Sequence, residues 1–161
     1  MALDVGSAAP DFTLLDQDRQ PVTLSAQRGA PVVLAFFPAA FSSVCVKELC
    51  TFRDRLATLN QARARVFGIS VDTFFTLKAF QSAQSLTFPL LSDFNKEVIE
   101  RYEVVNPDMI GLRGIAKRAV FVLDVDGTIQ YREVLDDARN EPNYDAVFTV
   151  LGRLGGGVAS S

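Results

Sequence analysis

The chain has 161 residues, of which 48% are hydrophobic, and this is enough for one globular domain with a substantial core. Nineteen acidic and sixteen basic residues give a net charge of −3 without a long basic block, which argues against nucleic acid as a partner. The first residues lack the features of a signal peptide, and no apolar run reaches the roughly 18 residues of a membrane span, so we expect a cytoplasmic protein that binds no membrane.

The first half of the chain predicts a hairpin followed by a strand-helix-strand unit. Two short alternating segments around a polar turn predict an N-terminal hairpin over Asp11–Leu24. Continuous apolar runs at Pro31–Phe37 and Arg65–Val71 predict strands that are buried on both faces. Between them, apolar residues recur at helical spacing from about Ser43 to Asn60, and the apolar face of this helix includes Cys45.

The second half predicts three more helices and a second hairpin. The helices are expected at Thr73–Ser85, Asn95–Tyr102 and Pro142–Leu154, the last with a proline that fits a first helical turn. Asp126-Gly127 is a strong hairpin signal, and it predicts a turn between a strand at Ala119–Asp124 and one at Ile129–Val134. We therefore predict one α/β domain over residues 1–154, with a flexible tail over residues 155–161.

The order of these elements is that of a thioredoxin-like fold. Such a fold has a central mixed sheet, flanking helices and, in this chain, an added N-terminal hairpin. No internal repeat, long linker or second domain is evident.

The cysteine and histidine counts limit the chemistry. Two cysteines are too few for the disulfide framework of a small secreted protein. With no histidine, the chain offers at most two of the four ligands that structural zinc usually takes, and it lacks the base of a Ser-His-Asp or Cys-His arrangement. We therefore expect no metal and no other cofactor, and any chemistry must come from Cys, Lys, Arg, Tyr or carboxylate groups.

The segment Phe36–Cys50 carries the candidate chemistry. A buried strand ends near Pro38 and a helix begins a few residues later, which is where catalytic groups collect in open α/β sheets. Cys45 lies in the first turns of that helix, where unpaired N–H groups and the helix dipole favour a thiolate, the nucleophilic form of cysteine. Pro38 shields one side of the sulfur in this interpretation, and Ser42 lies within hydrogen-bonding reach.

Each of these residues also has a purely structural interpretation. A single cysteine on the apolar face of a helix is usually a small core residue. Ser42 fits an ordinary helix N-cap, which does not conflict with a catalytic role. The position of Cys45 at the strand-to-helix junction favours function, but these residues alone leave both interpretations open.

The segment PAAFSSVC, with Pro38, Ser42 and Cys45, resembles the Pro-x-x-x-Thr/Ser-x-x-Cys signature of the peroxiredoxins, the alkyl hydroperoxide reductase/thiol-specific antioxidant family. Further segments are similar to the family in order and spacing, so the resemblance covers nearly the whole chain: Gly6–Phe12, Ser70–Asp72, Phe88–Asp93 and Arg118–Asp124. The resemblance implies that Cys45 is the peroxidatic cysteine and that Ser42 positions the peroxide in place of the commoner threonine. It implies that Arg118, otherwise an ordinary strand-edge arginine, is the activating cation, and Glu48 matches an acidic residue often found just after the nucleophile.

Cys50 follows Cys45 by five residues, a spacing that resembles the peroxiredoxin Q (bacterioferritin comigratory protein) type, whose resolving cysteine lies in the same helix. Residues five apart in an intact helix are roughly 8.7 Å apart at Cα, beyond the limit of about 7 Å for a disulfide. A disulfide between these two residues therefore requires the first helical turns to unwind. Lys47–Asp54 and the region near 106–113 resemble alkyl hydroperoxide reductase E-like members instead, and many of those lack a cysteine at position 50.

The resemblance implies a thiol peroxidase for hydrogen peroxide and organic hydroperoxides. In this reading Cys45 becomes a sulfenic acid, condenses with Cys50, and is reduced again by thioredoxin or a similar dithiol protein. A thioredoxin-like disulfide oxidoreductase is the alternative enzyme, although the chain has no Cys-x-x-Cys. A redox sensor or binding protein on the same fold is the non-enzymatic alternative, and the sequence leaves both a monomer and a homodimer open.

Overall fold

The computed structural model describes residues 3–58 and 64–159, in which strands and helices alternate along the chain. The elements are β1 (Thr13–Asp16), β2 (Pro21–Thr23), the 3-10 helix η1 (Leu24–Gln27), β3 (Val32–Phe36), α1 (Ser43–Thr58), β4 (Arg65–Ser70), α2 (Phe74–Gln84), β5 (Leu90–Ser92), α3 (Glu97–Arg101), β6 (Val105–Asn106), β7 (Ile115–Ala116), β8 (Arg118–Leu123), β9 (Ile129–Leu135) and α4 (Tyr144–Ala159). The long predicted strands and helices are confirmed, with ends that differ by a few residues.

Seven strands form one mixed sheet in the order β2-β1-β5-β4-β3-β8-β9. The central strands β3, β4 and β5 are parallel, since α1 and α2 carry the chain back between them. The remaining strands add in antiparallel pairs: β1 and β2 beside β5, and β8 and β9 beside β3. The predicted central mixed sheet with an N-terminal hairpin is therefore confirmed.

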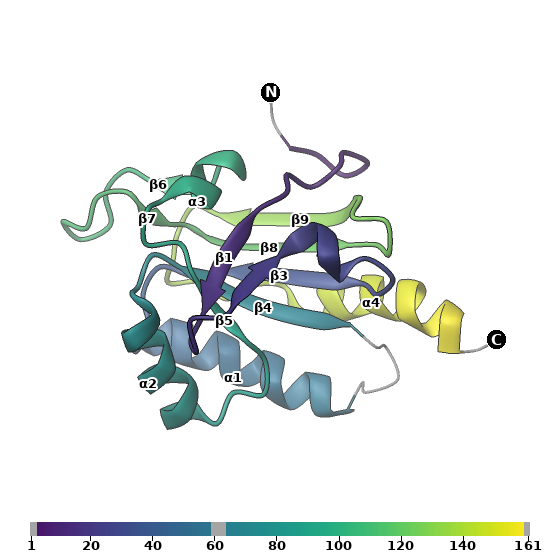
Figure 1. Ribbon diagram of the computed structural model, residues 1–161, viewed down its shortest axis with the longest axis horizontal. Helices are drawn as coiled ribbons and strands as arrows, with labels where there is room; N and C mark the ends of the chain where they lie inside the picture. Colours follow the sequence, from purple (N-terminus) through teal and green to yellow (C-terminus); the bar gives the residue numbers. More distant parts are fainter. Residues whose placement is uncertain (1–2, 59–63, 160–161) are drawn as a thin grey trace.

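Helices cover both faces of the sheet, with α1, α2 and α4 on one face and α3 on the other (Figure 1). Successive residues of β3 alternate between these two layers. Val33 and Ala35 pack with the layer of α1, whereas Leu34 and Phe36 pack with Tyr102 next to α3. These four residues of β3 have no exposed surface, which confirms the prediction that this strand is buried on both faces.

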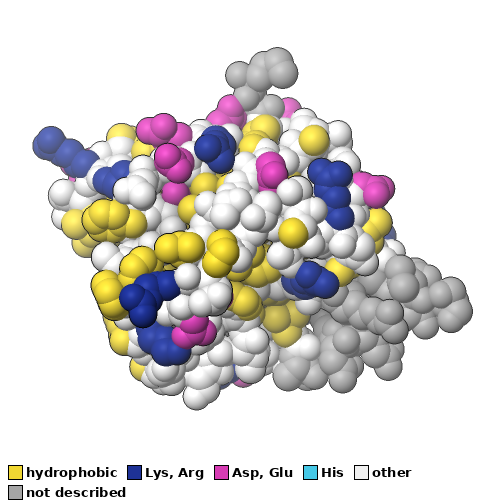
Figure 2. Space-filling model, in the orientation of Figure 1, with side chains coloured by type: hydrophobic (Ala, Val, Ile, Leu, Met, Phe, Trp, Pro, Cys, Tyr) yellow, Lys and Arg dark blue, Asp and Glu magenta, His cyan; other side chains and the backbone are white. Residues whose placement is uncertain are grey.

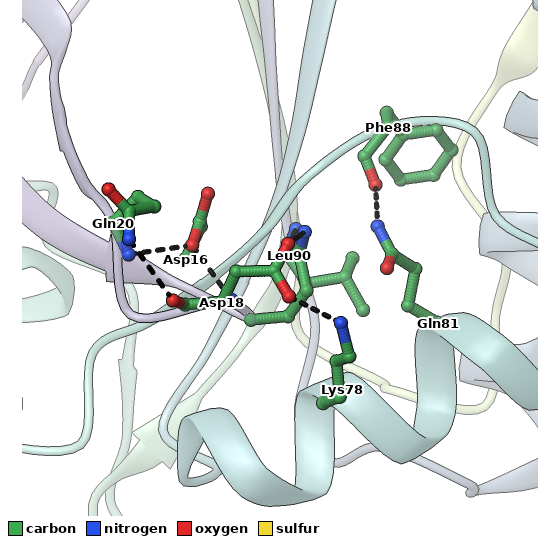
Figure 3. Close-up of polar contacts among 8 residues, drawn as sticks. Asp16, Asp18, Gln20, Lys78, Gln81, Phe88 and Leu90 are labelled. Carbon is green, nitrogen blue, oxygen red and sulfur yellow. Dashed lines mark hydrogen bonds and ion pairs between the residues drawn. The ribbon is translucent and has the colours of Figure 1, made fainter.

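The polar turn of the N-terminal hairpin joins β1 and β2 to the rest of the domain (Figure 3). Asp16 Oδ1 closes the turn by accepting a hydrogen bond of 2.8 Å from the Asp18 N–H. Lys78 on α2 forms an ion pair with Asp18, and Gln17 Oε1 accepts a hydrogen bond of 3.0 Å from the Leu90 N–H at the start of β5. These polar residues therefore fix the hairpin against α2 and β5.

Some elements differ from the sequence prediction. β5, β6 and β7 were not predicted, because strands of three, two and two residues are too short to show a pattern. The predicted end of α1 at Asn60 lies outside the described residues, whereas α4 extends to Ala159, beyond its predicted end at Leu154. The flexibility of residues 155–161 stays a prediction. Within the described ranges, no helix has the length and apolar character needed to cross a membrane.

Candidate active site

The sheet register brings Cys45 and Arg118 to the same place. β3 and β8 are antiparallel, and Phe36 at the end of β3 pairs with Ala119. The start of β8 therefore lies where the chain leaves β3, passes Pro38 and enters α1. Arg118 begins β8, Cys45 lies in the first turn of α1, and both are almost fully buried. Arg118 Nη1 donates a hydrogen bond of 3.4 Å to the Cys45 Sγ.

The guanidinium of Arg118 is also held by two other groups. Nε and Nη2 donate to the Ala138 carbonyl at 3.1 and 2.8 Å, and Nη1 donates to Glu48 Oε1 at 2.7 Å. Glu48 has no exposed surface, and it lies on the same side of α1 as Cys45 because the two are three residues apart. The arginine is therefore fixed from α1 and from the segment after β9 before any substrate binds.

Burial sets the charge states of this ion pair. Burial opposes the charge of Arg118, but Glu48 and Cys45 outweigh this effect and raise the pKa of Arg118 above its ordinary value. Burial also raises the pKa of Glu48 to about 7, against the opposing effect of Arg118. Arg118 therefore stays a cation, whereas Glu48 changes its protonation near neutral pH.

The segment between β3 and α1 is held by hydrogen bonds within the loop and to Asp72. Ser42 Oγ donates to the Ala39 carbonyl at 2.9 Å, which leaves the oxygen lone pairs free to accept. Asp72 Oδ2 accepts a hydrogen bond of 2.8 Å from the Ala40 N–H. Phe41 has a left-handed backbone with φ of 68°, and this bend turns the chain into α1.

A cavity of about 360 Å³ opens at this end of the sheet. Its lining residues come from the loop between β3 and α1, the start of α1, the connection between β6 and β7, the start of β8, and the segment after β9: Pro38, Ser42, Ser43, Val44, Met109, Ile110, Arg118, Asp137, Ala138 and Arg139. Ser42 and Arg118 thus border the same space as several apolar side chains. Cys45 has no exposed surface and is not itself among the lining residues, although its partner Arg118 is.

Cys50 lies apart from this group. It is half-buried, and its Sγ donates to Gln84 Oε1 on α2 at 3.6 Å. Both cysteines are free thiols, and α1 is helical through both positions. The structure therefore brings together four of the predicted site residues, Pro38, Ser42, Cys45 and Arg118, and does not bring Cys50 to them.

Comparison with known proteins identifies the family. The AhpC/TSA family matches residues 5–132. The chain belongs to this family. This peroxiredoxin is 43% identical over 135 residues to alkyl hydroperoxide reductase E of Mycobacterium bovis, an alignment that covers 82% of this chain and 86% of that protein. It is 42% identical over 126 residues to the chloroplastic peroxiredoxin Q of Oryza sativa subsp. japonica. This alignment covers 78% of this chain and 57% of that protein.

Solved structures agree with this assignment. A peroxiredoxin-like protein from Aquifex aeolicus superposes with a TM-score of 0.87 at 27% identity, covering 96% of this chain and 89% of that one. The fold is therefore thioredoxin-like, and the protein is a thiol peroxidase of the peroxiredoxin type. Relatives of the reductase E and peroxiredoxin Q types are about equally similar, so both subfamilies named by the resemblance stay open.

Sequence reasoning missed two residues that hold this site. Ala138 acts through its backbone carbonyl, so its side chain gives no signal in the sequence. Asp72 belongs to the Ser70–Asp72 segment, whose sequence indicates only a similarity to the family. A carboxylate directly after a buried strand was the available signal for its role at the Ala40 N–H.

Proposed function

We propose that Cys45 is the nucleophile of this peroxidase and that Arg118 activates it. The observation that carries the proposal is the hydrogen bond of 3.4 Å from Arg118 Nη1 to the Cys45 Sγ beside the cavity. The thiolate attacks one peroxide oxygen, the S–O bond forms, and the O–O bond breaks. The leaving oxygen departs as an alkoxide or hydroxide, and the arginine stabilises the charge that develops there before this oxygen takes up a proton.

Ser42 and Pro38 complete the proposed site. With its own proton directed to Ala39, the Ser42 oxygen is an acceptor for the O–H of a hydroperoxide. Pro38 is buried, has no N–H of its own, and lines the cavity next to this hydroxyl. The two residues therefore limit the directions from which a peroxide approaches the sulfur.

The cavity supports both hydrogen peroxide and organic hydroperoxides as substrates. The polar end near Arg118 and Ser42 suits the peroxide group. Val44, Met109 and Ile110 form an apolar part of the lining, which suits the hydrocarbon part of an organic hydroperoxide.

Cys50 is the proposed resolving cysteine. Its thiol condenses with the Cys45 sulfenic acid, so that a disulfide forms and water leaves. Because α1 is helical through both residues, its first turns must unwind, and the contact of Cys50 with Gln84 must break. Thioredoxin or a similar dithiol protein then reduces the disulfide, and we place this cycle in the cytoplasm.

The experiment is rapid mixing of the reduced protein with one equivalent of hydrogen peroxide, with chemical quenching and detection of remaining peroxide. We expect consumption far faster than by free cysteine, and loss of this reaction in Cys45→Ser. Consumption no faster than by free cysteine would contradict a peroxidase role. Disulfide reductase activity without peroxidase activity would favour the oxidoreductase alternative, and slow reaction with oxidation-dependent capture of one partner would favour a redox sensor.

Exposed apolar side chains favour the homodimer over the monomer. Figure 2 shows hydrophobic side chains gathered between α2 and α3. Phe75 on α2 and Phe94 before α3 are 70% and 59% exposed, and Ile110 at the cavity is 89% exposed. Large exposed apolar groups of this kind mark association surfaces. Sedimentation velocity tests this assignment, and the mass of a single chain at micromolar concentration would favour the monomer.

A further inference from the structure

Glu48 is an unusual partner for Arg118 because only one of its oxygens is satisfied. Oε1 accepts the 2.7 Å hydrogen bond from Arg118 Nη1, but no described residue donates a hydrogen bond to the buried Oε2. A buried carboxylate normally needs donors at both oxygens. This position therefore favours the neutral, protonated form of Glu48 more than an ordinary solvent-exposed site does.

The charged groups around Glu48 contain more potential anions than cations. The groups that face it are Arg118 from β8, Glu133 from β9, Glu141 before α4, and Tyr144 from α4. Cys45 from α1 shares the Arg118 Nη1 donor with Glu48. The charges of Glu141 and Glu133 both oppose ionisation of Glu48. Glu141 is itself paired with Lys47 at 3.2 Å, so this lysine already has a carboxylate partner.

Arg118 Nη1 donates both to the Cys45 sulfur and to Glu48, so one cation faces two groups that can carry a negative charge. With one of them ionised, the buried group is neutral overall. With both ionised it carries a net negative charge on side chains that have almost no exposed surface, which is costly. The two protonation equilibria are therefore coupled through the shared arginine.

We propose that Glu48 is a positioning residue that shares one proton with Cys45, so that a single negative charge faces Arg118. In the reactive form the charge is on the sulfur and Glu48 holds the proton; in the unreactive form the thiol holds the proton and Glu48 is ionised. This inference rests on the proposed role of Cys45 as the nucleophile.

The protons taken up and released in the peroxidase step are balanced in this proposal. Activation moves the thiol proton from the sulfur to the Glu48 carboxylate. Thiolate attack oxidises the sulfur to sulfenic acid, breaks the O–O bond, and leaves an alkoxide or hydroxide that needs one proton. Because the thiolate charge opposite Arg118 is then lost, Glu48 ionises and releases the proton that it held. The sum is thiol and hydroperoxide giving sulfenic acid and alcohol or water.

Infrared difference spectroscopy tests the proposal on the full chain at neutral pH. The spectrum of the reduced protein is compared with that after one equivalent of hydrogen peroxide. We expect a carboxylic acid C=O band in the reduced protein that is lost on oxidation, is absent from Glu48→Gln, and is unchanged in Glu100→Gln. Glu100 is an exposed glutamate on α3 and serves as the matched control. A wild-type spectrum with no carboxylic acid band that responds to peroxide would overturn the proposal, even if Glu48→Gln failed to fold.

A second measurement needs no peroxide. The rate of Cys45 alkylation by iodoacetamide is followed against pH, with peptide mass spectrometry separating Cys45 from Cys50. We expect two steps in the wild type and in Glu100→Gln. For Glu48→Gln we expect a single step, because the carboxylate that competes for the proton is gone. Identical profiles for wild type and Glu48→Gln would overturn the proposal. Slow peroxide consumption with the two-step profile intact would instead count against the proposed function.

Discussion

Replacing Arg118 with Met separates the proposed catalytic role of this residue from its structural role. The substitution keeps much of the apolar stem but removes the guanidinium, and with it the donors to the Cys45 sulfur, to Glu48 and to the Ala138 carbonyl. We expect the peroxide rate to fall about 100-fold to 1,000-fold, the usual cost of one donor positioned at developing charge.

The same substitution destabilises the fold, because it leaves Glu48 buried without its cation. Breaking a buried ion pair costs about 3 to 5 kcal/mol of unfolding free energy. Glu48 avoids part of this cost by taking up a proton, since its pKa is already raised by burial to about 7 and rises further without Arg118. Holding that proton at pH 7 costs about 3 kcal/mol for a group with an ordinary pKa of 4.5.

The double variant Arg118→Met with Glu48→Gln distinguishes the two roles. Removal of the carboxylate recovers about 3 kcal/mol of stability at pH 7 relative to Arg118→Met, while the peroxide rate stays low. Stability is measured by urea denaturation with far-ultraviolet circular dichroism, since the chain has no tryptophan to report by fluorescence. Peroxide consumption is measured by the quenched mixing experiment. A wild-type rate in Arg118→Met, or a rate that returns with stability in the double variant, would refute a direct role for Arg118 at the sulfur.

Three further perturbations test the cycle, the buried acid and the loop. In Cys50→Ser, one equivalent of peroxide leaves trappable sulfenic acid on Cys45, and excess peroxide drives this to sulfinic acid more readily than in the wild type. Turnover of Cys50→Ser with thioredoxin as reductant falls sharply. Only the wild type loses helical circular dichroism signal on oxidation. An unchanged rate of Cys50→Ser with thioredoxin would make the protein a one-cysteine peroxidase. Because the pKa of Glu48 is raised from 4.5 to about 7 on folding, its stabilising contribution is complete below about pH 4.5 and is lost as the pH rises through 7. Urea denaturation at about pH 5 and about pH 8 therefore reveals a loss of about 2.5 kcal/mol that Glu48→Gln lacks, and equal pH dependence in both proteins would count against a buried acid. Asp72→Ala removes the acceptor of the Ala40 N–H, and we expect it to slow peroxide attack about 10-fold by loosening the segment before α1, whereas a wild-type rate would show that this anchor is dispensable.

The local features of this site were predictable from the sequence. Pro38, Ser42 and Cys45 lie within one short segment, and strong apolar patterns on both sides fix the strand and the helix that they join. The role of Arg118 required the resemblance to the family. Its distance to Cys45 depends on the pairing of β3 with β8, and nothing in the sequence near position 118 specifies that register.

The role of the Ala138 carbonyl and the burial of Glu48 could not be predicted from the sequence for a similar reason. Ala138 follows β9, and its carbonyl reaches Arg118 only because β9 pairs with β8 and brings the chain back to the start of that strand. For Glu48 the sequence shows only a match to the family. Its complete burial and its unsatisfied oxygen follow from the packing of α1 on the sheet, which no local pattern states.

In the proposed cycle, the helix that positions Cys45 for peroxide attack is the same helix that keeps Cys50 away from it. With α1 intact, Cys45 lies against Arg118 and Cys50 contacts Gln84 on the neighbouring helix. A disulfide between the two needs the first turns of α1 to open, which also removes the sulfur from the arginine. The proposed cycle therefore assigns attack and resolution to two conformations of one segment. The balance between them decides how long a sulfenic acid stays beside the cavity, where a second peroxide can oxidise it further.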